Sequence, residues 1–358
     1  MKKFRFLRVL FTGLIAVLLF CTSCQKKETL PENYALYGYA VGDPSDGYGT
    51  ILFTNNGGTS WSRLGNANLA PNISFYDVRA VNETDVWIVG AAHQGYGLIL
   101  HSTDGGVNWN RAGDALSLPN NDIRSISIPN KTSIYIAGDH RTFAYSRNYG
   151  GTWTEVIFDS TMVPMVDFRA VASSGDSNVW VVGKVTDSVA PDSVSIILHS
   201  HNGGITWTRQ YASSGIPNDF NDVFCLNDSI VYAAGSNGIY TYITGTIWGY
   251  LHDSSPKKML GICALDQNNI WGVGTGDLVY SYDYATATWV TMTVPVFGYE
   301  FTDVTISNDV NIYLCGKPSA GYGKGTILSS HNGGKTWFVG SFPTFSGLNA
   351  ISFVGAKK

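Results

Sequence analysis

The chain has few charged residues, few cysteines and little helical periodicity. Charged residues make up 14% of the 358 positions, and acidic residues outnumber basic ones by 27 to 23. The resulting net charge of −4 argues against nucleic acid as a partner, because nucleic-acid binding needs a basic surface. The five cysteines show neither the spacing of a metal site nor that of a disulfide framework.

Motifs for catalysis or for cofactor binding are also absent from the sequence. It contains neither a Gly-x-Ser-x-Gly nucleophile turn nor a glycine-rich phosphate loop between a strand and a helix. The alternation of His199 and His201 leaves a metal site open, but His101 and His331 occupy similar turns, so we interpret all four as repeat variants. We therefore expect no catalytic residue, no cofactor and no metal.

A long apolar run stands at the beginning of the chain. Residues 9–20 are apolar, and the small residues Thr22 and Ser23 precede Cys24. The segment before this run is basic, with Lys2, Lys3, Arg5 and Arg8. The arrangement resembles a bacterial lipoprotein signal, with cleavage before Cys24 and lipid on its thiol. The alternative is an uncleaved membrane anchor, for which the run is short.

The expected organisation follows from this reading. Residues 1–23 form the signal peptide, 24–34 a lipidated tether, and 35–358 the folded domain. The polar stretch 25–33 within this tether spans at most about 30–35 Å, so the domain would lie close to its membrane. We expect a monomer in the bacterial cell envelope, anchored by lipid at the outer membrane or the cell surface.

A repeat runs through the remainder of the chain. Its first mark is an aromatic residue, two small or aliphatic residues and a glycine. The seven glycines of this mark are Gly42, Gly90, Gly138, Gly183, Gly235, Gly274 and Gly316. Each period contains about four short β-type runs, as residues 77–109 illustrate. A period in the 40s with four strands is typical of propeller blades, and seven marks predict seven blades.

The second mark is a turn of the form Ser/Thr-x-Asp/Asn-x-Gly-x-Thr/Ser/Asn-Trp. It is intact at 54–61, 102–109, 146–153, 200–207 and 330–337, and eroded in the fifth and sixth blades. We expect the Asp or Asn to accept backbone hydrogen bonds and the glycine to adopt a positive φ. The tryptophan should then pack between sheets.

The two ends of the domain complement each other. Blade one begins at its second strand, 37–42, whereas the pattern of 348–353 matches the first strand of blade two at 76–81. The C-terminal strand is therefore predicted to complete blade one and to close the ring. The fold class is all-β, a seven-bladed β-propeller of four-stranded antiparallel blades.

The turns resemble the BNR, or Asp-box, repeat. Together with the aromatic-x-x-Gly strands, they make the chain similar to the photosystem II stability/assembly-factor-like propellers, which include many bacterial lipoproteins. The lipid anchor, the rigid scaffold and the lack of catalytic groups favour a non-enzymatic binding or assembly scaffold for a protein or glycan. Another candidate role is that of a purely structural surface protein. Because Asp-box propellers include sialidases, the alternative is a glycan-acting hydrolase. The Arg-Ile-Pro motif of sialidases is absent from this sequence.

Three arginines follow aspartates near the start of the first strand in consecutive blades. The pairs are Asp77-x-Arg79, Asp122-x-Arg124 and Asp167-x-Arg169, and we interpret them as one repeated position. The first strand lines the channel of a propeller, so the arginines predict a cationic strip for a partner's carboxylates. The resemblance implies such an inner-strand patch, although only three blades keep it. The alternative is that each arginine pairs with an aspartate between blades.

Three tyrosines occur in Gly-Tyr-Gly loops. Tyr48, Tyr96 and Tyr322 lie between the second and third strands of blades one, two and seven, which are neighbours in a closed ring. They predict an aromatic shelf on one rim that stacks on a sugar or a peptide. The alternative is hairpin tips whose tyrosines lie on the sheet.

Overall fold

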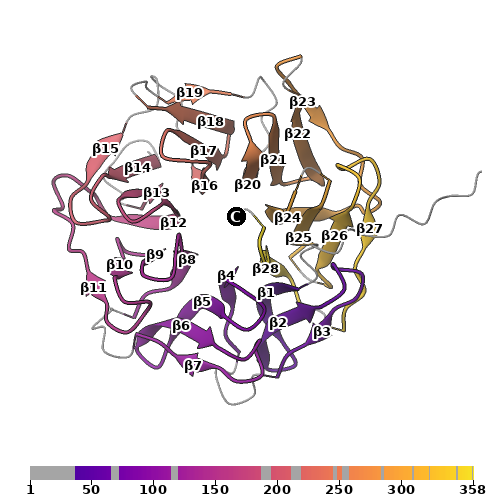
Figure 1. Cartoon of the computed structure of the whole chain (residues 1–358), viewed down its shortest axis with the longest axis horizontal. Helices are drawn as coiled ribbons and strands as arrows, with labels where there is room; N and C mark the ends of the chain where they lie inside the picture. Colours follow the sequence, from indigo (N-terminus) through magenta and orange to yellow (C-terminus); the bar gives the residue numbers. More distant parts are fainter. Residues whose placement is uncertain are drawn as a thin grey trace, which may run out of the picture. The chain divides into compact units, whose positions relative to one another are not determined.

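The computed structural model describes residues 37–65, 72–113, 120–186, 195–210, 219–244, 248–251, 258–283, 286–308, 310–321, 323–343, 346–356 and 358. Regular structure in these ranges is entirely β, in seven four-stranded antiparallel sheets arranged around a centre (Figure 1). The predicted all-β seven-bladed propeller is therefore confirmed. Within the described ranges, no helix is long and apolar enough to span a membrane.

The strands follow one order in every blade, from the channel outwards. Blade one contains β28 (Leu348–Phe353), β1 (Gly38–Ser45), β2 (Tyr48–Thr54) and β3 (Ser62–Arg63). Blade two contains β4 (Phe75–Ala80), β5 (Val86–His93), β6 (Tyr96–Ser102) and β7 (Asn110–Arg111). Blade three contains β8 (Ile123–Ser127), β9 (Ile134–Gly138), β10 (Phe143–Ser146) and β11 (Thr154–Glu155).

The remaining four blades repeat this order. Blade four contains β12 (Val166–Ser174), β13 (Asn178–Val185), β14 (Ser195–Ser200) and β15 (Thr208–Gln210). Blade five contains β16 (Phe220–Cys225), β17 (Ile230–Gly235), β18 (Gly238–Ile243) and β19 (Gly249–Tyr250). Blade six contains β20 (Met259–Asp266), β21 (Asn269–Gly274), β22 (Leu278–Asp283) and β23 (Thr288–Thr291). Blade seven contains β24 (Tyr299–Ile306), β25 (Ile312–Pro318), β26 (Thr326–Ser330) and β27 (Phe338–Val339).

The ring is closed as the sequence predicts. Strand β28 pairs antiparallel with β1, with Tyr39 opposite Ser352. A buried hydrogen bond of 2.7 Å between the hydroxyls of Thr50 and Ser346 joins the same two parts of the chain. Closure leaves β1 paired on both edges, which removes an open edge from the ring.

Each innermost strand contains a β-bulge near its start. The register shifts there in all seven blades, opposite the glycine of the aromatic-x-x-Gly mark. A bulge inserts one unpaired residue and re-aims the side chains beside it. The inserted residues are Tyr76, Arg124, Arg169, Asn221, Leu260, Thr302 and Asn349.

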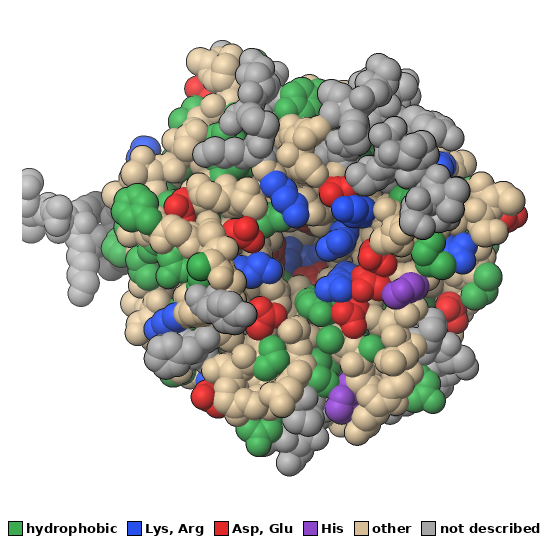
Figure 2. All heavy atoms as spheres, turned by 180° about the vertical axis from the view of Figure 1, so that it is seen from behind, with side chains coloured by type: hydrophobic (Ala, Val, Ile, Leu, Met, Phe, Trp, Pro, Cys, Tyr) green, Lys and Arg blue, Asp and Glu red, His purple; other side chains and the backbone are tan. Residues whose placement is uncertain are grey.

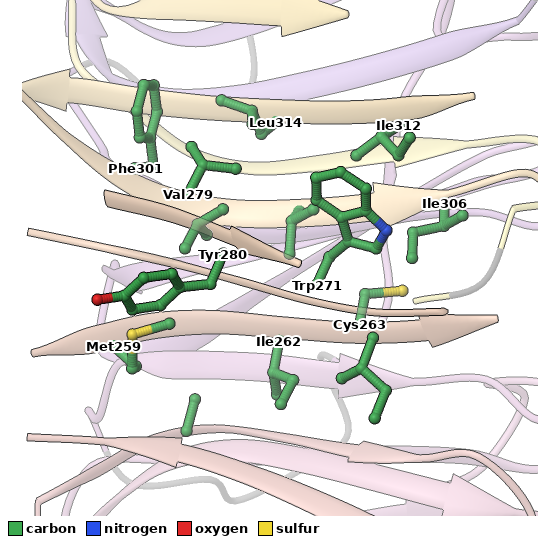
Figure 3. Packing of buried hydrophobic residues seen from close by; sticks show 14 of the residues in the cluster. Met259, Ile262, Cys263, Trp271, Val279, Tyr280, Phe301, Ile306, Ile312 and Leu314 are labelled. Atoms are coloured by element: carbon green, nitrogen blue, oxygen red, sulfur yellow. The ribbon is translucent and has the colours of Figure 1, made fainter. Parts of the chain in front are cut away.

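Apolar side chains fill the spaces between neighbouring blades. Figure 3 shows the packing between blades six and seven, where Trp271, Met259 and Phe301 belong to one buried cluster. Burying a side chain of this size contributes roughly 1.5–3 kcal/mol. Because β-strands alternate their side chains, both faces of each blade are apolar and each blade is held by two neighbours.

The five intact turns form the hydrogen bonds expected of them. In the turn at 102–109, the Ser102 hydroxyl accepts from Gly106 N at 2.8 Å, and Asp104 Oδ1 accepts from Asn108 N at 2.8 Å. Gly105 and Gly106 have φ of 74° and 86°. Trp109 is buried, whereas Trp153 of blade three remains half-buried. The turns thus fix the connection between the third and fourth strands in these five blades.

Candidate functional site

The candidate site is the mouth of the central channel where the innermost strands begin. Lys and Arg side chains gather around a central hollow on one face of the molecule, with acidic side chains among them (Figure 2). The cavity at this mouth has a volume of about 140 Å³, and all seven inserted bulge residues line it. The bulges are therefore what brings Arg124 and Arg169 together with Tyr76 around one opening.

The three predicted arginines do not occupy one repeated position. Asp77 lies opposite Val89, whereas Ser125 and Ala170 hold the corresponding places opposite Ala137 and Val182. Arg124 and Arg169 are thus inserted bulge residues, as is Tyr76. Arg79 lies three residues beyond that position in its strand, deeper in the channel. The prediction of one shared position was wrong because the bulge adds a residue that the Asp-x-Arg pattern does not reveal.

Arg124 is engaged by its own surroundings. Its Nε and Nη2 bind Asp139 at 2.9 and 2.7 Å, and its Nη2 lies 3.1 Å from Asp122. The guanidinium stands 4.2 Å from the ring centre of Tyr76 in the neighbouring blade. Burial alone would lower the pKa of Arg124, but the bonds to Asp139 raise it above its ordinary value. Most donors of this arginine are therefore used within the scaffold.

Arg79 also has a structural role. Its Nε donates to the carbonyl of Ile126 in the next blade at 2.7 Å, and its Nη2 lies 3.8 Å from Asp77. Arg79 thus joins neighbouring blades through a backbone carbonyl, whereas its aspartate partner lies in its own strand. The alternative of Asp–Arg pairing between blades is therefore not formed at Arg79. The side chain is 16% exposed, so little of it is accessible from the mouth.

Arg169 differs from the other two arginines. Its side chain is exposed at the mouth, and within the described ranges it has neither an ion pair nor a hydrogen bond. Lys184 lies in the adjacent strand and pairs with Asp219 at 3.3 Å. The mouth therefore offers one uncommitted guanidinium whose five donors can bind a carboxylate in bidentate fashion.

Two of the three predicted tyrosines lie on equivalent hairpins. Tyr48 and Tyr96 are 37% and 45% exposed, and each is separated from its pairing partner, Ser45 or His93, by a two-residue turn. Arg63 and Arg111 donate to the carbonyls of Tyr48 and Tyr96, at 3.2 and 3.4 Å, and hold the hairpins in place. Tyr322 and Cys24 lie outside the described residues. The structure thus places two exposed rings on neighbouring blades, and the shelf of three stays a prediction.

A buried ion cluster inside the channel escaped the sequence analysis. Lys358 Nζ lies 3.0 Å from Asp77 Oδ1 and 2.7 Å from Asp303 Oδ2. Burial alone would raise the pKa of Asp77, but Lys358 and then Arg79 hold it below its ordinary value. The recurrence of Asp77, Asp222 and Asp303 at one position of the repeat could have indicated the carboxylates of this cluster. No sequence pattern indicated that Lys358 would reach them, because the chain after β28 belongs to no repeat.

The channel carboxylates also bind the backbone of the next blade. Asp77 accepts from Ile126 N at 3.0 Å, Asp222 from Ile262 N at 2.8 Å, and Asp303 from Ile351 N at 2.8 Å. These bonds account for the aspartates as links between blades. Among the described residues, no group of three or more His, Cys, Asp or Glu side chains is arranged to hold a metal ion.

No family model matches the chain. The photosystem II assembly lipoprotein Ycf48 of Synechococcus sp. (strain CC9902) is 26% identical over 248 residues, which is 56% of this chain and 69% of that protein. The chain is similar to Ycf48. The predicted resemblance to photosystem II assembly-factor-like propellers is thereby confirmed.

Solved structures agree on the fold. Ycf48 bound to a D1 peptide has a TM-score of 0.57 at 16% identity, covering 75% of this chain and 82% of that one. Ycf48 from Cyanidioschyzon merolae has a TM-score of 0.54 at 19% identity, with coverages of 74% and 84%. Streptogramin B lyase reaches a TM-score of 0.53 at 14% identity, with coverages of 80% and 92%. Since a lyase shares the propeller, the fold by itself does not decide the function.

Proposed function

We propose that this chain is a non-enzymatic binding propeller that holds an acidic segment of a partner protein at the channel mouth. The observation that carries the proposal is the exposed, uncommitted guanidinium of Arg169 at the opening. The similarity to Ycf48 supports it, because one solved Ycf48 structure contains a bound D1 peptide. The same similarity favours an assembly scaffold over the glycan-acting hydrolase.

Arg169 would act by bidentate binding of a carboxylate, either an acidic side chain or a chain terminus. A charge-assisted pair of this kind is roughly twice as strong as a neutral hydrogen bond. Arg124 would attract the carboxylate electrostatically but would offer it few hydrogen-bond donors, since Asp139 and Asp122 already bind its guanidinium. The exposed rings of Tyr48 and Tyr96 would supply a second, apolar contact for the same partner.

The test compares two single substitutions. Arg169→Ala removes the free charge at the mouth, and Lys131→Ala removes an exposed charge beside the cavity at the other end of the channel. The native complex is isolated from its own membranes, and the co-purified protein is quantified by mass spectrometry. We expect the amount of co-purified partner to fall at least about tenfold with Arg169→Ala, because this variant loses a bidentate ion pair. Lys131→Ala should change the amount little.

Equal recovery with both variants would contradict the proposal. The melting temperature of each variant serves as the control for folding. A catalytic role would be supported instead by turnover of glycosides that Arg169→Ala leaves intact.

The same proposal extends to the anchor. Residues 1–23 would be removed as a signal peptide, Cys24 would carry lipid, and residues 24–34 would tether the monomeric propeller 35–358 to the outer membrane or cell surface. The relative named an assembly lipoprotein supports this reading. Labelled fatty acid should enter the wild-type chain in its native host and not Cys24→Ser; label in both would rule out Cys24 as the modified residue.

A further inference from the structure

The ammonium group of Lys358 is completely coordinated inside the channel. Its three acceptors are Asp77 Oδ1 at 3.0 Å, Asp303 Oδ2 at 2.7 Å and the carbonyl oxygen of Val78 at 3.2 Å. A primary ammonium has three N–H donors and no acceptor. The number of acceptors therefore matches the number of donors, and two of the acceptors carry the opposite charge.

We propose that Asp77, Asp303 and the Val78 carbonyl form a binding site for a primary ammonium, which Lys358 of the same chain fills in this structure. The site accepts any unhindered alkylammonium, including a lysine side chain of another molecule. Lys358 is thus a built-in ligand. A cation that enters the channel must displace it.

The site is held in shape by groups other than Lys358. Asp77 accepts hydrogen bonds from Ile126 N and from the hydroxyl of Ser125, both in the next blade. Asp303 accepts from its neighbour Val304 N and from Ile351 N. Because these donors belong to paired strands, the two carboxylates stay in place when the lysine side chain is absent. When Lys358 is absent, the two buried carboxylates keep one cation within ion-pair distance in the described ranges, Arg79 at 3.8 Å from Asp77. Two preorganised negative charges with a single remaining counter-ion create affinity for a second cation.

Asp222 shows what happens to such a carboxylate without an ammonium. It holds the same repeated position as Asp77 and Asp303 and likewise accepts two backbone hydrogen bonds. Within the described ranges no cation lies within ion-pair distance of it. Burial and then the charge of Asp303 raise its pKa to about 7, whereas Lys358 helps to hold the pKa of Asp77 low.

Lys358 lies, together with Arg79, between the two ends of the channel. It lines both the cavity of about 140 Å³ at the site mouth and a second cavity of about 430 Å³ at the other end. Gly355 and Ala356 line the second cavity, so the segment after β28 enters from that end. Figure 1 marks the end of the drawn chain at the centre of the ring. Once Lys358 has left, an ammonium can reach Asp77 and Asp303 from the mouth, because both carboxylates line its cavity.

The test is chemical rescue of Lys358→Ala. This substitution removes three methylenes and the ammonium, which together correspond to n-propylamine. We expect a melting temperature lower by at least about 3 °C, restored in part by millimolar n-propylamine in a saturable manner. Tetramethylammonium chloride at equal ionic strength should give no rescue, because that cation has no N–H donor.

Two matched variants decide the outcome. Lys131→Ala lacks an exposed lysine and should show no response to n-propylamine, and Lys358→Ala combined with Asp303→Asn should lose the rescue. An unchanged melting temperature in Lys358→Ala, or equal shifts with both salts, would overturn the proposal. If Lys358→Ala cannot be purified, Lys358→Ser replaces it in the n-propylamine titration, because serine leaves a similar space in the channel.

Discussion

A β-carbon on Gly138 would lie 2.0 Å from the carbonyl oxygen of Asp122. The same close approach occurs at Gly42, Gly183 and Gly274, with carbonyl oxygens at 2.1, 2.3 and 2.1 Å. In each case the carbonyl belongs to the residue two positions before the inserted bulge residue, at or next to the start of the innermost strand. The glycine of the repeated mark is thus required by the bulge that turns side chains into the channel.

Gly138→Ala is therefore expected to destabilise the ring. The added methyl group must push two paired strands apart, at a cost of about 2–3 kcal/mol. Gly249→Ala is the matched control, since it also lies in a strand and a β-carbon there would meet no atom within 4 Å. Urea unfolding of both variants measures the difference, and equal midpoints would refute the steric explanation.

Arg79 and Arg169 should respond differently to the same substitution. Arg79→Met removes the donor to Ile126 O and leaves Asp77 with one cation fewer, so we expect a loss of about 1–3 kcal/mol. Arg169→Met should change stability by less than about 0.5 kcal/mol, because that side chain is exposed and unpaired. Thermal unfolding distinguishes the two. A large loss at Arg169 would show that it is bound within the scaffold.

Asp222 should make the propeller less stable as pH rises from about 4 to 7. Its pKa in the folded chain is about 7, above that of an unfolded aspartate, so the folded state holds the extra proton within this range. The effect is at most about 4 kcal/mol. His199 acts in the opposite direction, because burial and the neighbouring His201 lower its pKa to about 4.

Asp222→Asn isolates the aspartate from these other groups. Its urea midpoint, relative to that of the wild type at each pH, should rise between pH 4.5 and 8. The histidines contribute equally to both proteins and cancel. A constant difference across the range would contradict the raised pKa.

Ala112→Leu should stabilise the interface between blades two and three. In four other blades, the residue directly after the outermost strand is a larger apolar one, namely Leu64, Val156, Leu251 or Met292. Each of these side chains packs against a buried hydrophobic cluster that contains a tryptophan. In blade two it is Ala112, and a cavity of about 630 Å³ opens beside Trp153. Filling part of it should gain about 1 kcal/mol. Ala112→Ser, of similar size to alanine, should show no gain in denaturant midpoint.

The blades could be predicted from the sequence because each one carries its own marks. Seven glycines and five turns set the number and the order of the sheets, and the pattern of 348–353 identified the strand that closes the ring. The mouth was harder, since a bulge shifts the side chains of Arg124 and Arg169 without altering the spacing of the repeats. Lys358 was missed because its contacts depend on the path of a segment that belongs to no repeat.

The pairing of β28 with β1 has a consequence for synthesis. Tyr39 leaves the ribosome 313 residues before Ser352, its neighbour in the sheet. At about 5–20 residues per second, this interval lasts roughly 15–60 s. Until then β1 exposes an unpaired edge that can recruit other strands, so prematurely terminated products should aggregate more readily than the finished chain.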